Sequence, residues 1–229
     1  MLSIDLNPAE ILGYIPRTYL YASNITDYKI PDNVTSIGGS AFFSCSSLVN
    51  IVIPDNVTII GPHAFSKCSS LTSVIIPDSV TLMGQGVFYN CTSLTNVVIG
   101  DGVTKIDHDM FAGCSALTSI TIPDSVTSIG SYALFKCSSL TNVIIGDGVT
   151  SIDSFAFEGC SSLANVVIPN HVTSIGDYAF YKCSSLKEIT FKGTKKQAIQ
   201  CGIGKQVRKK WREGSAIKKI ICIDGVIEL

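Results

Sequence analysis

Nine cysteines make thiol chemistry the first question that this sequence raises, because thiolates bind metals, form disulfides and act as nucleophiles. Metal ligands cluster at short spacings such as C-x₂-C, and disulfide frameworks are typical of short, secreted, loop-rich chains. Seven of the cysteines recur at a constant spacing, and stacking of such repeats would bring neighbouring thiols within disulfide range. Seven is an odd number, however, so these thiols cannot all pair. We therefore expect buried, reduced thiols that pack as small hydrophobic groups, and only Cys201 and Cys222 stay candidates for a disulfide. Seven of the nine recur at a constant step of 23 residues, at Cys45, Cys68, Cys91, Cys114, Cys137, Cys160 and Cys183.

Histidine, serine and aspartate residues do not form a catalytic pattern. His63, His108 and His171 lie at different places of the repeated pattern and in different copies, so no Ser/His/Asp or Cys/His arrangement recurs. No phosphate-binding glycine loop follows a predicted strand. We therefore expect a protein that is not an enzyme and that has no cofactor and no metal.

An aspartate follows the first β-rich motif of most copies and could be taken for a calcium ligand. The glycine-rich nonapeptide of calcium β-rolls is absent, however, and an Asp at the start of a tight turn accepts hydrogen bonds from nearby backbone N–H groups. The turn interpretation is therefore favoured. The column consists of Asp32, Asp55, Asp78, Asp101, Asp124 and Asp147.

The step of 23 residues extends to the residues around each cysteine and defines a repeat. Each Cys is followed three positions later by a Leu, then by a β-rich pattern, a Pro-Asp or Gly-Asp turn, a V-T-x-[IM] motif and usually Ala-Phe. In residues 48–54 and 56–60 the apolar positions suit two short strands that stack on their copies in neighbouring turns. The A-F-x-x-C piece favours a single helical or 3₁₀ turn. Since one turn cannot bury its apolar face alone, the pattern predicts a mainly β repeat solenoid.

The same register continues upstream in a weaker form. Ala22 and Tyr14 would take the places of Cys45 and Ile37. The sequence N-P-A-E at residues 7–10 is typical of a helix start, with Asn as the N-cap and Pro at the first helical position. We predict that residues 1–16 form an N-terminal cap.

A lysine-rich segment follows the solenoid, which we assign to residues 17–191, and predicts a C-terminal cap at residues 192–229. Within it, residues 194–213 predict a helix and residues 217–223 a final strand. Capping repeats with a polar outer face are required at solenoid ends. Phosphate contacts would need a basic cluster such as the one present here, but a solvated cap face is favoured over nucleic-acid binding. This basic cluster consists of Arg208, Lys209, Lys210 and Arg212.

The pattern C-x-x-L-x-x-I-x-I-P-x-x-V-x-x-I-G-x-x-A-F-x-x-C resembles the BspA-like class of leucine-rich repeats over roughly residues 18–191. The end resembles that family's C-terminal module, in which a Lys- and Trp-containing insert, here with Trp211, leads to a C-x-D-G strand, here beginning at Cys222. The resemblance implies a right-handed leucine-rich-repeat superhelix with 23-residue turns, short helical or 3₁₀ turns, capped ends and one sheet on its concave side. It also implies adhesion or protein binding, mostly in bacteria, their phages and parasitic protists.

Charge is distributed unevenly along the chain. Residues 1–186 contain 6 Lys/Arg and 14 Asp/Glu, whereas residues 187–229 contain 11 Lys/Arg and 4 Asp/Glu. No stretch approaches the roughly 20 apolar residues of a membrane helix, so no membrane insertion is expected. The first residues, MLSIDLNPAE, lack a basic region followed by an apolar run, so we expect no signal peptide and favour an intracellular location over a surface or secreted one.

Strand alternation predicts where a partner would bind. The Leu and the two flanking β-branched positions of L-x-x-I-x-I point inward, so the residue between the latter points outward. The predicted concave sheet would then expose a β-branched stripe beside an Asn/Ser row, and such an apolar patch often marks an interface. The alternative is that β-branched residues merely suit a strand. The residues predicted to bind are Asn50, Val52, Ile75, Asn96, Val98, Thr121, Asn142, Ile144 and Val167.

A second, weaker candidate is the variable edge that follows the I-G positions. Loops on a rigid scaffold often carry recognition, and these positions differ between copies where the core positions do not. We call this set the loop edge. Its members are His63, His108, Tyr132, Phe155 and Tyr178.

These observations favour a non-catalytic interaction module that binds a protein partner on its concave sheet or its loop edge, as a host-factor-binding or adhesion protein. One alternative is a self-assembling structural protein, because identical turns and an apolar stripe also favour self-association. Another is a phage-encoded or intracellular inhibitor of a host protein.

Overall fold

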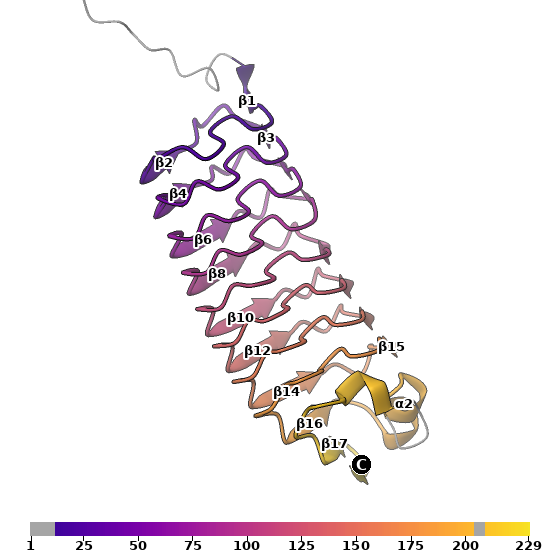
Figure 1. Cartoon of the computed structure of the whole chain (residues 1–229). Helices are drawn as coiled ribbons and strands as arrows, with labels where there is room; N and C mark the ends of the chain where they lie inside the picture. The colour runs from indigo at the N-terminus through magenta and orange to yellow at the C-terminus, as the bar shows by residue number, and fades with distance from the viewer. Residues whose placement is uncertain (1–11, 204–208) are drawn as a thin grey trace, which may run out of the picture.

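The computed structural model describes residues 12–203 and 209–229, with the side chain of Lys209 excepted. The predicted N-terminal helix start at residues 7–10 lies outside the described residues, and the predicted domain boundaries stay predictions. The chain winds into a β-solenoid of about eight turns with about 23 residues in each turn and almost no helix, as the sequence predicts (Figure 1). No helix among the described residues is long and apolar enough to cross a membrane.

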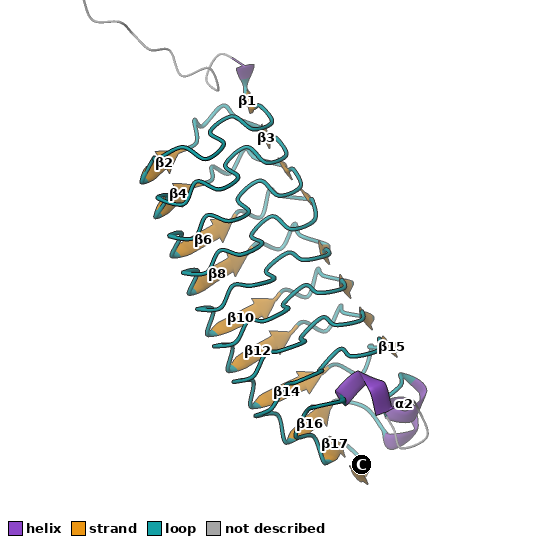
Figure 2. Ribbon diagram, viewed as in Figure 1, coloured by secondary structure: helices purple, strands orange, loops and turns teal. Residues whose placement is uncertain are grey.

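One side of the solenoid consists of the longer strands. These strands lie one after another along the rod, and most of them pair in parallel with their copy in an adjacent turn (Figure 2). Paired residues are equivalent positions of the repeat: Asp27 lies opposite Asn50, and Ser119 lies opposite Asn142. Because paired residues are one repeat apart, each buried Val or Ile packs on another. The longer strands are β2 (Asp27–Lys29), β4 (Asn50–Val52), β6 (Ser73–Ile76), β8 (Asn96–Ile99), β10 (Ser119–Ile122), β12 (Asn142–Ile145), β14 (Asn165–Ile168) and β16 (Glu188–Phe191).

A second side consists of two-residue strands that also pair in parallel, turn on turn. In each, the second residue is an apolar side chain that joins the core, while the first faces outward or is half-buried. These strands are β1 (Tyr14–Ile15), β3 (Ser36–Ile37), β5 (Ile59–Ile60), β7 (Leu82–Met83), β9 (Lys105–Ile106), β11 (Ser128–Ile129), β13 (Ser151–Ile152) and β15 (Ser174–Ile175).

The third side is a succession of tight turns, and the predicted helical or 3₁₀ turn at A-F-x-x-C is absent from the described repeats. Backbone N–H groups there alternate in direction: Ser40 and Phe42 donate to carbonyls of the next turn, whereas Ala41 and Cys45 donate to carbonyls three residues back. A helix would send every N–H group back along the same segment. The alternation requires left-handed backbone conformation at two positions of each turn, such as Ser40 with a φ of 55°.

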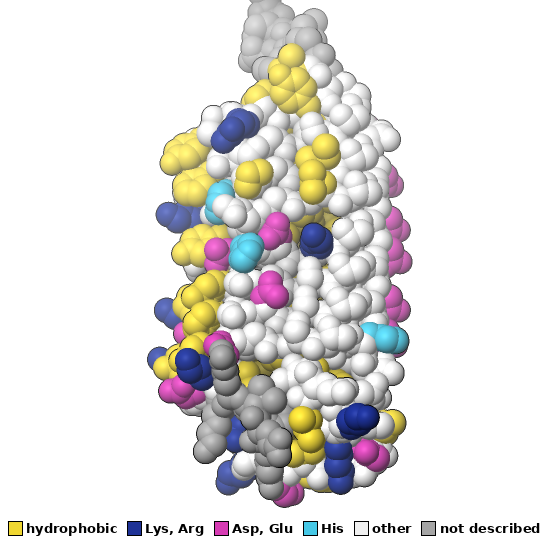
Figure 3. Space-filling view, turned by 90° about the vertical axis from the view of Figure 1, so that its right-hand side faces the viewer, with side chains coloured by type: hydrophobic (Ala, Val, Ile, Leu, Met, Phe, Trp, Pro, Cys, Tyr) yellow, Lys and Arg dark blue, Asp and Glu magenta, His cyan; other side chains and the backbone are white. Residues whose placement is uncertain are grey.

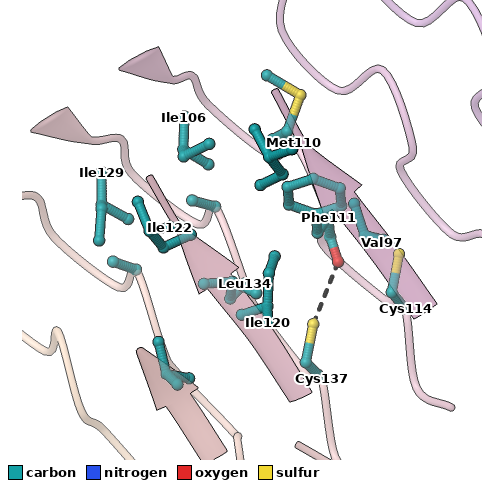
Figure 4. Packing of buried hydrophobic residues seen from close by; sticks show 14 of the residues in the cluster. Val97, Ile106, Met110, Phe111, Cys114, Ile120, Ile122, Ile129, Leu134 and Cys137 are labelled. Carbon is teal, nitrogen blue, oxygen red and sulfur yellow. Dashed lines mark hydrogen bonds between the residues drawn. The ribbon is translucent and has the colours of Figure 1, made fainter. Parts of the chain in front are cut away.

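Phenylalanine rings and thiols fill the centre. The rings of Phe88 and Phe111 stack 5.6 Å apart and 2° from parallel. The Sγ of Cys137 donates a hydrogen bond to the carbonyl oxygen of Phe111, 3.2 Å away (Figure 4). That oxygen also accepts the N–H of Cys114. A thiol therefore suits this column because it fills a small apolar space and bonds to the turn before it.

The first turn departs from the predicted register by one residue. Tyr14 pairs with Ser36 and Ile15 with Ile37, so the buried Ile15 and not the exposed Tyr14 occupies the Ile37 column. Likewise Ser23, and not Ala22, approaches the cysteine column, with its Oγ 3.5 Å from the Sγ of Cys45. The predicted upstream alignment is therefore wrong for this turn, because the turn contains 22 residues up to this point.

The C-terminal segment covers the last turn. Where one helix was predicted over residues 194–213, the described part contains α2 (Lys195–Gln200), with a capping box between Thr194 and Gln197, and the 3₁₀ helix η1 (Lys209–Arg212). Residues 204–208 lie outside the described residues.

Trp211 ends the phenylalanine column. Its ring meets that of Phe180 edge-on, 6.1 Å away, and it is buried. Beyond it, β17 (Lys219–Cys222) pairs in parallel with β16 and antiparallel with β18 (Gly225–Glu228). The antiparallel partner β18, which the sequence had not predicted, closes the sheet of longer strands.

Candidate protein-binding surface

An apolar stripe runs along the outside of the longer strands, and we call this side the strand face. The strands alternate exposed and buried positions, so the middle β-branched residue of each faces solvent. Thr121 is exposed within the stripe, as the sequence predicts for its position. Exposed fractions of the apolar members are 54% for Val52, 65% for Ile75, 48% for Val98, 54% for Ile144 and 39% for Val167.

A polar row borders the stripe at the start of each strand. Asn50, Asn96 and Asn142 are exposed there. Asn50 donates from Nδ2 to Oδ1 of Asp27, 2.7 Å away, and this hydrogen bond lowers the pKa of the Asp27 carboxyl below its usual value. The structure thus brings the nine predicted strand-face residues together on one exposed side.

Aspartates border the stripe on its other side, at the turns that follow the strands. We call Asp32, Asp55, Asp78, Asp101, Asp124 and Asp147 the Asp row; all six are exposed. Figure 3 shows acidic side chains in a line along one border of its view. Sequence reasoning treated them as turn residues alone, although their constant distance of three residues from the stripe was a signal that the two share a surface.

Shallow hollows lie between the stripe and the Asp row. One, of about 220 Å³, is lined by Val52, Ile75 and Asp55 among others. A second, of about 380 Å³, includes Ile144 and Asp124 in its lining. Apolar and acidic side chains therefore line the same hollows.

Hydrogen bonds and ion pairs within the Asp row differ along its length. Asp78 accepts the backbone N–H of Asp101 at 2.9 Å, and Asp124 accepts that of Asp147 at 2.7 Å, so the aspartates bond across turns and not only within their own. Lys192 places its Nζ 2.8 Å from Oδ1 of Asp147, and this bond lowers the pKa of the Asp147 carboxyl. Among residues 12–203 and 209–229, no group of three or more His, Cys, Asp or Glu side chains could hold a metal ion.

The loop edge lies on the side of tight turns. His63, Tyr132, Phe155 and Tyr178 share one column and have φ values of 56–62°, while His108 precedes that column by one residue. Such backbone conformation is uncommon for bulky residues. The Phe155 ring stacks on Tyr132 at 4.8 Å and on Tyr178 at 5.0 Å, so these rings are half-buried against one another. Packing between turns accounts for the aromatic column without a ligand.

Only part of the predicted basic cluster is available at the surface. Lys210 is exposed, whereas Arg212 donates from its guanidinium to the carbonyl oxygen of Ile217, 2.9 Å away. Arg208 and the side chain of Lys209 lie outside the described residues. The described members therefore do not form a continuous cationic patch.

Eight of the nine thiols have a raised pKa and are not suited to nucleophilic chemistry. Cys45 is the exception, because a hydrogen bond with Cys68 lowers its pKa to about 6, but its side chain is fully buried and so is closed to a substrate. All nine cysteines are free and buried, including Cys201 and Cys222, the predicted candidates for a disulfide. Burial raises the pKa of the Cys91, Cys137 and Cys183 thiols to about 12, so little thiolate forms near neutral pH.

The stacked parallel strands, the 23-residue turns and the exposed sheet define a leucine-rich-repeat protein. The chain belongs to the BspA type leucine rich repeat family: the model of that repeat region matches residues 13–137 and 104–201, in 6 copies. No curated protein matches the chain.

Solved bacterial leucine-rich repeat proteins share the fold. One from Eubacterium ventriosum is 27% identical over 73% of this chain and 45% of that chain, with a TM-score of 0.68. One from Bacteroides ovatus is 26% identical over 92% of this chain and 59% of that chain, with a TM-score of 0.64. This chain thus spans about half the length of these relatives. The pneumococcal vaccine antigen PcpA, at 18% identity and a TM-score of 0.56 over 86% of this chain and 62% of that chain, shows the likeness of fold alone.

Proposed function

We propose that this protein is a non-catalytic interaction module that binds a protein partner across its strand face. The observation that carries the proposal is the exposed stripe centred on Ile75, Val98 and Ile144, which no other part of the described chain covers. Large apolar side chains left in solvent in one contiguous row are typical of an interface. Members of this family generally act in protein interaction or surface adhesion.

The shape of the face supports the same proposal. Parallel stacking holds the stripe on a rigid sheet, so little ordering would oppose docking. Asn50, Asn96 and Asn142 provide amide groups beside the stripe, which resembles the arrangement of apolar centre and polar rim in protein interfaces.

Paired variants test the face. We expect Val98→Lys/Ile144→Lys to lose a partner that the wild type captures from lysate of the cells that express it, as identified by mass spectrometry. A matched control is Ile59→Lys/Leu82→Lys, because these side chains are also exposed and apolar, at 41% and 58%, but lie on the short-strand side. If the strand-face variant keeps every protein that the control keeps, the strand face is not the binding site.

Self-association would use the same face but depends on concentration. Light scattering at two protein concentrations separates the possibilities, because assembly must increase with concentration. A constant mass equal to one chain leaves a different protein as the partner.

A further inference from the structure

The Asp row is neutralised at its ends and not in its middle. Lys29 lies 3.3 Å from Asp32 at one end, and Lys192 lies 2.8 Å from Asp147 at the other. Between them, Asp55, Asp78, Asp101 and Asp124 have no ion pair with any Lys or Arg of the described residues. Four exposed carboxylates therefore stand in line beside an exposed apolar stripe.

The spacing of these groups limits what could cover both. Stacked parallel strands lie about 4.8 Å apart, so the four central aspartates span about 14 Å, and the stripe has the same spacing. In an α-helix parallel to the solenoid axis, residues three or four apart advance about 5 Å and lie on one face. In an extended peptide, residues on one face advance about 6.7 Å. A helix thus keeps register with the turns over this length, whereas an extended strand does not.

Charge complementarity fixes the chemistry of such a helix. Its apolar side would lie on Ile75, Val98 and their neighbours, and one flank would lie over the Asp row. Lys192 is an example of such an ion pair within this chain, because its ammonium group contacts the carboxylate of Asp147 beside the hollow that Ile144 lines. Lys or Arg on that flank would complete the same pairing along the middle of the row.

We infer that the strand face and the Asp row together form a docking groove for a basic amphipathic α-helix of a protein partner, with apolar side chains on the stripe and Lys or Arg side chains on the central aspartates. The inference rests on the proposed function and names the chemistry of the partner. About ten helical residues cover the four central aspartates.

A selection experiment tests the inference without knowledge of the natural partner. The probe is a displayed library of helical peptides in which one face is apolar and both flanking positions vary among Lys, Arg, Glu, Gln and Ser. Clones are selected on the full chain, and those that bind Val98→Lys/Ile144→Lys equally well are discarded. We expect the remaining clones to be enriched in Lys or Arg on one flank only.

Charge-neutral variants supply the decisive comparison. Asp78→Asn/Asp101→Asn/Asp124→Asn keeps the side-chain oxygens that accept backbone N–H groups but removes three charges. For a selected peptide, fluorescence anisotropy should show binding weakened about tenfold, since each exposed pair contributes little, and the loss should shrink at high salt. The control, Asp107→Asn/Asp153→Asn/Glu158→Gln, changes the net charge equally away from the Asp row and should leave binding unchanged.

Several outcomes would overturn the inference. They are clones without a basic flank, equal binding by the Asp-row variant and wild type, or no clone that depends on the stripe. The capture experiment tests the proposed function separately. If Val98→Lys/Ile144→Lys loses a captured partner but the selection gives one of these outcomes, the strand face still binds a protein, and only the inference of a basic helix is wrong.

Discussion

Truncation of one core ring, Phe111→Ala, should be among the most damaging single changes in the solenoid. Phe111 is fully buried, stacks on Phe88 and lies one turn before Leu134 in the same column. The neighbouring turns would hold the walls of the resulting cavity in place, so little structural relaxation would offset the lost contacts.

The expected size follows from the lost burial. Removing a ring takes away roughly 150 Å² of buried apolar area, which at about 25 cal/mol per Å² corresponds to about 4 kcal/mol. Phe→Ala changes in cores cost about 3–5 kcal/mol. Since each turn contacts only its neighbours, a weakened middle turn should also uncouple the two halves and broaden or split the unfolding transition.

Urea unfolding followed by far-UV circular dichroism measures the effect. Phe111→Leu should cost only about 1 kcal/mol, because Leu134 already fills the equivalent place in the next turn. Phe135→Ala is the matched control: this ring is half-buried, and Ala112 occupies its column in the preceding turn. Equal losses for Phe111→Ala and Phe135→Ala would refute the role assigned to the ring column.

Two other predictions concern the backbone and the thiols. Gly102→Ala should lower the free energy of unfolding by about 1–3 kcal/mol in the same assay, because the added Cβ would overlap the backbone oxygen of Asp78. Gly39→Ala should cost less, because its Cβ would lie 3.3 Å from the carbonyl oxygen of Pro62, which is a tight contact but not an overlap; equal effects would contradict this account. Stability should fall as pH rises from about 9 towards 12, because burial holds the pKa of thiols such as Cys137 near 12 while the unfolded thiols ionise near 9. The free energy of unfolding measured across that range should decline less steeply in Cys137→Ala, by about 1.4 kcal/mol per pH unit, and an unchanged slope would show that this thiol is not responsible.

The sequence was sufficient to predict the solenoid and the exposed stripe. A step of 23 residues fixes which residues stack on one another, and strand alternation then fixes that Val98 faces outward while Val97 and Ile99 face inward. Both conclusions need only the repeat and the period of a β-strand.

The turns were harder to predict because several residue types occupy them. Left-handed backbone conformation occurs at Lys67, Asn90 and Lys136 as well as at Gly113 and Gly159, which share one column. Glycine and asparagine in that column were a usable signal against a helical turn. The lysines obscured it, since nothing in their type indicates such a conformation.

Register in the first turn was also beyond the sequence pattern. Both Tyr14 and Ile15 are apolar β-formers, so either could be aligned with Ile37, and only the packing distinguishes them. The neighbourhood of the Asp row and the stripe is a different case, because their constant distance of three residues was a usable signal, and the structure adds the hollows that the two line together.

The hydrogen bonds that join each turn to the next also bear on how such proteins change length over generations. Because Phe42, Phe65 and Phe88 use the same N–H to reach the following turn, a duplicated 23-residue unit would find its bonding partners already in place on both sides. Recombination between copies could therefore add or delete whole turns while the two ends, with the shortened first turn and Trp211, remain as they are. Selection would then act on the number of turns, and thus on the length of the surface, without altering the core of any one turn.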